Sequence, residues 1–243
     1  MKYLFVWLIS IVFVFADEAD DIVKAVEKNL RGDYMYAQMR MIVTSKRGQR
    51  TVKVESWSQG DKKSFIKILY PKQDMGITFL KLDTQMWQYL PKIERIIKIP
   101  PSMMLQSWMG SDFTNDDMVK ESSMSKDYDA RLLLKKMPIV TIELIPKPNA
   151  AVVWGKIVTD IDISRKVPLK EVYYDDQMQE VRIMTFSDIR QAGSHILPMK
   201  MELQPLDPDK KQNRTQVFFE KVNYDNPIDP AYFTKQALKR FSN

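Results

Sequence analysis

Several side chains of this protein are of types used in hydrolysis, but their spacing does not fit that chemistry. The only histidine, His195, directly follows Ser194. A serine hydrolase needs its nucleophile on a strained turn such as Gly-x-Ser-x-Gly, and no segment of the sequence has that pattern. A histidine without such support is usually a hydrogen-bonded structural residue. We therefore expect no catalytic residues and no enzymatic activity.

Three carboxylates, Asp112, Asp116 and Asp117, lie close together in the sequence. The ligand spacing of an EF-hand calcium loop is missing, whereas carboxylates near a helix start act as caps. Thr114 and Asp117 have the spacing of a capping-box-like pair. The chain has no cysteine, which excludes disulfides, thiolate metal sites and cysteine nucleophiles. We expect neither a bound metal nor another cofactor.

Basic residues Lys92, Arg95 and Lys98 recur along one predicted strand. Such a row is either an ordinary solvated face or a surface that contacts lipid head groups or an acidic partner. The formal net charge is +6, but basic and acidic residues are interleaved along the chain and form no nucleic-acid-binding module. We expect no nucleic-acid partner and only peripheral contact with membranes.

The first sixteen residues have the order of a Sec signal peptide. Lys2 supplies the positive start, an almost entirely apolar run follows, and Val14 and Ala16 are small residues at the positions that precede a cleavage site. The run is shorter than the roughly 20 residues that span a bilayer, although an uncleaved anchor is the alternative. We expect a signal peptide over residues 1–16, cleavage near Ala16, a periplasmic location, and one mature domain over residues 17–243.

The mature chain is predicted to be mainly β with a few helices. Apolar residues recur at helical spacing over 18–31, and the period then changes to the two-residue alternation of strands. Turn residues such as Arg47-Gly48 and Gly60-Asp61 separate the strands. The pattern predicts an antiparallel meander, with candidate strands at 34–43, 51–57, 65–70, 76–82, 86–90, 95–99, 128–137, 139–146, 151–163, 168–175, 179–189, 194–204 and 213–223.

Short helices are predicted at three further places. Pro100-Pro101 ends a strand and can open a helix, so residues 102–109 are expected to form a short, very apolar helix. A second helix begins at Thr114, and residues 230–241 form a third. These helices are too few to fill a large concave sheet, which would then enclose an apolar cavity. The sixteen methionines suit such a cavity, although an ordinary methionine-rich core is the alternative.

The segment from Met86 to Asp117 carries a resemblance to a known family. It begins Met-Trp-Gln-Tyr-Leu-Pro and ends Trp-Met-Gly-Ser-Asp-Phe-Thr-Asn-Asp-Asp. These residues resemble the LolA-like family of outer-membrane lipoprotein-sorting proteins, and in particular the branch with the Met-Gly-Ser-Asp-Phe motif. The resemblance covers residues 17–243, and the motif at 109–113 is its most specific part.

The resemblance implies a fold, a ligand and partners. The fold is an incomplete, half-open antiparallel β-barrel wrapped around a helical plug or lid, as in LolA and LolB. The implied function is that of a periplasmic carrier, which binds lipid or lipoprotein acyl chains in an apolar cavity and ferries them between the inner and outer membrane. An inner-membrane exporter and an outer-membrane acceptor are the implied partners. Our candidate residues for the cavity and its lid are Trp57, Phe65, Trp87, Tyr89, Ile97, Met103, Met104, Trp108, Met109 and Phe113.

The sequence leaves two alternatives open. Residues 100–113 are either a movable lid over the cavity or a fixed plug, because sequence does not reveal motion. The alternative function is a non-enzymatic accessory of an inner-membrane exporter, whose concave face would hold a segment of a partner protein in place of lipid.

Overall fold

The computed structural model describes residues 7–120 and 124–242, and it describes side chains from residue 18 onward except that of Lys120. The first six residues of the predicted signal peptide lie outside the described residues. Helix α1 (Trp7–Arg31) contains the rest of that segment together with the helix expected over 18–31. No helix in the described part of the chain has the length and apolar character needed to cross a membrane.

The strands of the described residues form a single antiparallel sheet, as the alternating sequence pattern predicts. Its order is β6-β5-β4-β3-β2-β1-β13-β12-β11-β10-β9-β8-β7. The strands are β1 (Tyr34–Ser45), β2 (Gly48–Gln59), β3 (Lys63–Tyr70), β4 (Thr78–Leu82), β5 (Gln85–Leu90), β6 (Arg95–Lys98), β7 (Tyr128–Lys136), β8 (Ile139–Pro146), β9 (Lys156–Asp162), β10 (Val167–Tyr174), β11 (Glu180–Ala192), β12 (His195–Pro205) and β13 (Arg214–Tyr224).

The sheet curves but does not close. Strands β6 and β7 are its two edges and do not pair with each other. The first strand, β1, pairs with the last strand, β13, so these two strands lie side by side near the middle of the sheet. The predicted fold class, a half-open antiparallel barrel around helices, is confirmed.

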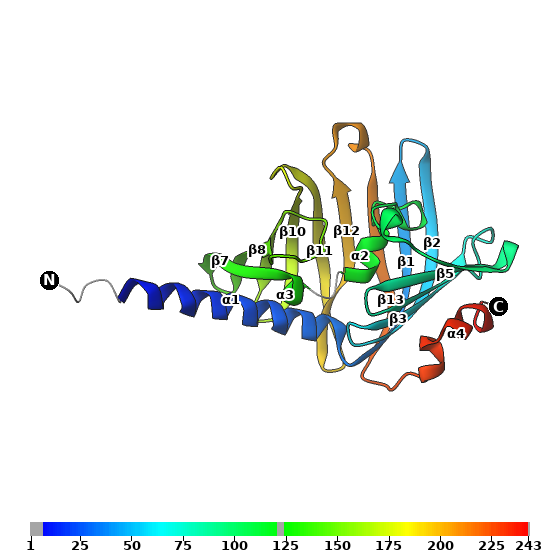
Figure 1. The fold of residues 1–243 in the computed structure, drawn as a ribbon, viewed down its shortest axis with the longest axis horizontal. Coiled ribbons are helices and arrows are strands. Elements are labelled where there is room, and N and C mark those ends of the chain that lie inside the picture. The colour runs from blue at the N-terminus through cyan, green and yellow to red at the C-terminus, as the bar shows by residue number, and fades with distance from the viewer. Residues whose placement is uncertain (1–6, 121–123, 243) are drawn as a thin grey trace.

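Helices α1, α2 (Asn115–Lys120) and α3 (Met124–Asp127) lie against the concave face of this sheet (Figure 1). Helix α1 contributes Val23 and Val26 to the main core, an apolar cluster that also includes strand residues such as Met41 and Leu203. Apolar burial of this kind stabilises the fold by roughly 25 cal/mol for each Å² removed from water. The core therefore lies between the helices and the inner face of the sheet.

A second apolar cluster covers the outer face of β3, β4 and β5. Phe65, Leu80 and Trp87 on these strands pack against Leu238 and its neighbours in the C-terminal segment. The helix expected over 230–241 is present as two pieces, the 3₁₀ helix η5 (Pro230–Phe233) and helix α4 (Lys235–Arg240). They separate at Thr234, whose side chain caps α4 by accepting from the Ala237 amide at 3.2 Å. The sheet is thus covered on both faces at this end.

The prediction of one apolar helix over 102–109 was wrong. The segment instead forms two 3₁₀ helices, η2 (Pro101–Met103) and η3 (Trp108–Gly110). Two other 3₁₀ helices, η1 (Pro91–Ile93) and η4 (Pro208–Lys210), form short turns elsewhere in the chain. An isolated antiparallel bridge between Ser107 and Thr114 draws the backbone out of helical geometry between η2 and α2. Met109 and Gly110 then take positive φ angles of 49° and 68°, which an α-helix does not contain.

Candidate functional site

A cavity of ≈320 Å³ lies between the concave face of the sheet and helices α1 and α2. Its volume is at the lower end of the about 300–1,000 Å³ typical of ligand sites. Apolar side chains from both halves of the sheet line it, among them Val54, Ile66 and Phe186. Six methionines contribute to the wall, namely Met35, Met39, Met41, Met118, Met124 and Met201. Flexible thioether side chains let such a wall adapt to apolar ligands of different shape.

A few buried polar residues interrupt this apolar wall. Thr159 on β9 and Glu171 on β10 are direct cross-strand partners, and both line the cavity. Burial raises the pKa of Glu171 to about 7, although a hydrogen bond donated by the Tyr173 hydroxyl at 2.5 Å lowers it. Near neutral pH, the carboxyl therefore exchanges between its neutral and charged forms. On the other half of the sheet, Lys81 of β4 also lines the cavity and is buried.

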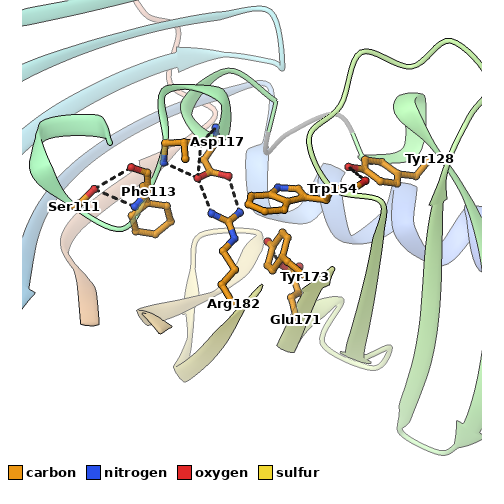
Figure 2. A network of polar contacts seen from close by, with 9 residues as sticks. Ser111, Phe113, Asp117, Tyr128, Trp154, Glu171, Tyr173 and Arg182 are labelled. Atoms are coloured by element: carbon orange, nitrogen blue, oxygen red, sulfur yellow. Dashed lines mark hydrogen bonds and ion pairs between the residues drawn. The ribbon is translucent and has the colours of Figure 1, made fainter. Parts of the chain in front are cut away.

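An ion pair joins helix α2 to the sheet beside the cavity. Asp117 of α2 accepts two hydrogen bonds from the guanidinium of Arg182 on β11, at 2.6 and 2.8 Å. Figure 2 shows this guanidinium between the carboxylate and the rings of Trp154 and Tyr173, and it lies 4.1 Å from the centre of each ring. Both charged side chains are buried, with 8% and 6% of their surface exposed. Aromatic faces and a carboxylate together compensate the cation for its loss of water.

The Met-Gly-Ser-Asp-Phe motif folds into a tight turn that is fixed at both ends. Ser111 donates through its hydroxyl to the Trp108 carbonyl at 2.7 Å, and the Trp108 amide donates to the Phe113 carbonyl at the same distance. Asp112 accepts from the Thr215 hydroxyl of β13 at 2.7 Å. A side chain at Gly110 would come within 3.0 Å of the Arg50 guanidinium. The motif is therefore explained by its geometry as a structural anchor.

The predicted capping pair is present. The Asp117 carboxylate accepts from the Thr114 amide and hydroxyl at 2.7 and 2.9 Å, and the Thr114 hydroxyl accepts from the Asp117 amide at 3.2 Å. Asp112 and Asp117 hold different partners, Thr215 and Arg182, and no group of metal-binding side chains is found in the part of the chain that the structure describes.

The structure distributes the predicted cavity residues over three environments. Trp108 and Phe113 line the cavity. Met103, Met104 and Met109 are partly buried and pack against the main core. The other predicted residues lie outside the cavity. They are Trp57, Phe65, Trp87 and Tyr89 in the outer cluster and Ile97 on the edge strand β6, where 38% of its surface is exposed.

This placement of the aromatic residues corrects our expectation that they face inward. On β2 and β3 the neighbours that face the cavity are Ser56, Ser58, Ser64 and Ile66. Because side chains alternate between the two faces of a strand, Trp57 and Phe65 must point outward. Trp57 stacks there on Tyr232, with ring centres 4.6 Å apart.

Lys92, Arg95 and Lys98 are all exposed, and the last two belong to the edge strand β6. The Lys98 ammonium lies 5.7 Å from the centre of the Trp87 ring. The row therefore lies on the surface at the edge of the sheet, away from the cavity-lining residues.

His195 connects α1 to the sheet. Its Nδ1 lies 2.7 Å from the Asn29 carbonyl of α1, and its Nε2 lies 2.9 Å from the Asp225 carboxylate. The Ser194 hydroxyl donates to the same carboxylate at 3.2 Å. The serine and histidine side chains thus share an acceptor in place of the nucleophile–base contact that hydrolysis requires.

Sequence reasoning missed Thr159, Glu171 and Arg182. The sequence does contain a signal for Arg182, because it lies on the same face of β11 as the buried apolar residues Met184 and Phe186. A charged residue in such a row predicts a buried partner. For Thr159, whose small hydroxyl suits either face of a strand, the sequence offers no comparable signal.

Comparisons with known proteins agree with the fold. A domain from Vibrio parahaemolyticus, provisionally described as an outer membrane lipoprotein-sorting protein domain, has a TM-score of 0.81 at 21% identity, and the match covers 93% of this chain and 100% of that one. A DUF1329 family protein from Desulfovibrio piger has a TM-score of 0.85 at 19% identity, with 92% and 99% covered. A LolA superfamily protein from Nitrosomonas europaea has a TM-score of 0.75 at 15% identity, with 90% and 98% covered.

No curated protein matches the sequence. One family model, described as "-like: Uncharacterized protein", matches residues 60–240. The match includes the Met-Gly-Ser-Asp-Phe motif, the ion pair of Asp117 with Arg182, and most strands around the cavity. Because it spans well over half of the chain, the protein belongs to this family of uncharacterized proteins, and its fold is the LolA-like fold that the sequence motif predicted.

Proposed function

We propose that this protein is a non-enzymatic carrier that binds lipid or lipoprotein acyl chains in the cavity of the half-open sheet. The observation that carries the proposal is the methionine-rich, mainly apolar cavity of ≈320 Å³ on the concave face. Each buried methylene contributes about 0.8 kcal/mol, so a single long chain would be held by roughly 10 kcal/mol gross. The LolA-like fold is the supporting argument.

We also propose where the carrier works. The leader over residues 1–16 would direct export, and cleavage near Ala16 would leave residues 17–243 as one domain in the periplasm. Transfer would then run between the inner and outer membrane, from an exporter to an acceptor. Intact mass measurement of protein recovered from the periplasm tests this step, because it must show a chain that begins near Asp17.

The exposed row of Lys92, Arg95 and Lys98 is the proposed contact with lipid head groups or an acidic partner. Arg95 and Lys98 lie on the edge strand β6, Lys92 lies on η1 just before it, and all three side chains are exposed. Ile96 and Ile97 on the same strand are also exposed, at 43% and 38%. Cations beside apolar side chains suit brief contact with an anionic membrane surface.

Filling the cavity tests the carrier function. Met201 lines the cavity on β12, so Met201→Trp should reduce both the lipid that co-purifies in native mass spectrometry and the binding of an apolar fluorescent dye. Met75→Trp is the matched control, because Met75 is 54% exposed and does not line the cavity. Equal lipid occupancy in both variants, or repeatedly lipid-free wild-type protein, would contradict the proposal.

A further inference from the structure

The hairpin of β7 and β8 ends in an exposed apolar tip. We define the tip as residues 133–139, whose sequence is Leu-Leu-Lys-Lys-Met-Pro-Ile. Large apolar side chains there are 40–65% exposed, namely Leu133, Leu134, Met137 and Ile139. Soluble domains rarely leave a continuous apolar patch in water unless that patch binds something. The tip is therefore a candidate interaction site, and it is separate from the cavity, whose described lining includes none of its residues.

The register of the hairpin turns the outer side of the tip away from the core. Lys135 pairs with Val140, which is buried in the main core. Because neighbouring side chains alternate between the two faces of a strand, Leu134, Lys136 and Ile139 lie on the opposite, outer face. The C-terminal segment, which covers the outer face of β3, β4 and β5, lies at the other end of the sheet (Figure 1). The outer face of the tip is thus left to solvent.

Basic side chains lie in and beside the tip. They are exposed and come from two neighbouring turns, namely Lys135, Lys136, Arg165 and Lys166. The turn between β9 and β10 is held against the tip by its Ile163 amide, which donates to the Pro138 carbonyl at 3.0 Å. Lys135 and Arg165 are paired with acids, whereas no ion pair of Lys136 or Lys166 is found among the described residues. The tip therefore complements a surface that is both apolar and anionic.

Two kinds of protein partner fit the tip poorly. An added strand would need the free edge of β7, but a bulge between Leu132 and Leu134 interrupts that edge, and Asp20 of α1 accepts from the Ala130 amide at 3.1 Å. Bulges, covered amides and lysines are features that prevent edge pairing. A second copy packed tip to tip would bring the same cations together, which is unfavourable. A bilayer that contains anionic lipids meets neither obstacle, because it surrounds apolar side chains and attracts lysines.

We propose that residues 133–139 insert into the interface of an anionic lipid bilayer. Leu134, Met137 and Ile139 would enter the boundary of the acyl region, while Lys136 and Lys166 would reach the head groups. This membrane site is separate from the basic row beside β6, because β6 and β7 are the two opposite edges of the sheet. It is also independent of the ligand that the cavity binds.

A fluorescent label tests insertion directly. The chain has no cysteine, so Met137→Cys provides a single attachment site for the environment-sensitive dye NBD. Vesicles of phosphatidylethanolamine and phosphatidylglycerol should raise the NBD emission and shift it to shorter wavelength, and vesicles of phosphatidylcholine alone should do so less. Met178→Cys is the matched control. Met178 is 51% exposed, but it lies in the turn between β10 and β11 beside Asp175 and Asp176, so its label should not respond.

Two substitutions separate the apolar and the charged contributions. In co-sedimentation with the same anionic vesicles, Leu134→Asp should reduce binding about tenfold or more, because it replaces an inserting side chain with an anion. Lys136→Gln should reduce binding about fivefold at low salt, and this difference should disappear at high salt. Both residues are exposed, so the melting temperature and dye binding in the cavity should stay at the wild-type level.

Three results would overturn the proposal. The first is an unchanged label at Met137 or equal vesicle binding by Leu134→Asp and wild type. The second is a response of a label at Ile97→Cys without one at Met137→Cys, which would place the membrane contact on β6. The third is photo-crosslinking from position 137 to an acidic periplasmic protein without any response to vesicles, which would assign the tip to a protein partner. Because these measurements do not involve the cavity, the carrier function stands or falls separately.

Discussion

The buried ion pair between Asp117 and Arg182 should be the strongest single attachment of helix α2 to the sheet. Asp117→Asn removes the negative charge from a site where two hydrogen bonds of 2.6 and 2.8 Å join the carboxylate to the guanidinium. The guanidinium would stay between Trp154 and Tyr173, but a neutral amide would replace the carboxylate that binds it. Breaking a buried pair by removal of one partner costs about 3–5 kcal/mol, because a buried charge is left uncompensated.

Urea unfolding and thermal unfolding measure this cost. For a domain of this size, about 2–4 °C are lost per kcal/mol, so the melting temperature of Asp117→Asn should fall by about 6–20 °C. Asp188→Asn is the control, because Asp188 pairs with Arg190 at 2.8 Å in an exposed position. Its removal should cost much less, because water screens an exposed ion pair. Equal destabilisation by the two substitutions would contradict the claim that burial makes the Asp117–Arg182 pair contribute more to the free energy of unfolding than an exposed pair.

Two further predictions concern the cavity wall and the outer face. Because burial raises the folded-state pKa of Glu171 to about 7, above its ordinary value of 4.5, its contribution to stability is fully present below pH 4.5 and is lost as pH rises through 7. Wild type should lose about 3 kcal/mol more than Glu171→Gln over that range, as measured by urea unfolding at pH 4.5 and 8. Phe65 is fully buried in the outer cluster, so Phe65→Ala should lose about 3–5 kcal/mol while dye binding in the cavity stays at the wild-type level; weaker dye binding would contradict its assignment to the outer face.

Local rules were enough to predict the strands, the first helix and the cap. The alternation of Val52 and Val54 with Lys53 and Glu55 predicts a half-buried strand, and β2 has that burial pattern. Thr114 and Asp117 form the expected pair because capping depends only on residues three apart. These features are decided within a few residues, so the sequence contains all the information that they need.

Assignment of the inner face required contacts that are distant in the sequence. Phe65 and Ile66 are adjacent on β3 and both are buried, on opposite faces. Phe65 is buried outside the barrel only because the segment near Leu238 covers that face. Since the strand pattern is apolar on both faces, it does not identify the face that holds the cavity. The aromatic residues were therefore assigned inward on residue type alone.

The same long-range contacts bear on the choice between a lid and a fixed plug. Opening residues 100–113 as a lid would break the hydrogen bonds between Asp112 and Thr215 and strain the neighbouring pair of Asp117 with Arg182. Loss of that buried pair would cost about 3–5 kcal/mol, which ligand binding would have to offset in every cycle. The partly buried methionines of the wall, such as Met39 and Met201, can instead change rotamer at little cost. These contacts favour the fixed-plug alternative for residues 100–113, and under the proposed carrier function an acyl chain would enter and leave along the adaptable methionine wall.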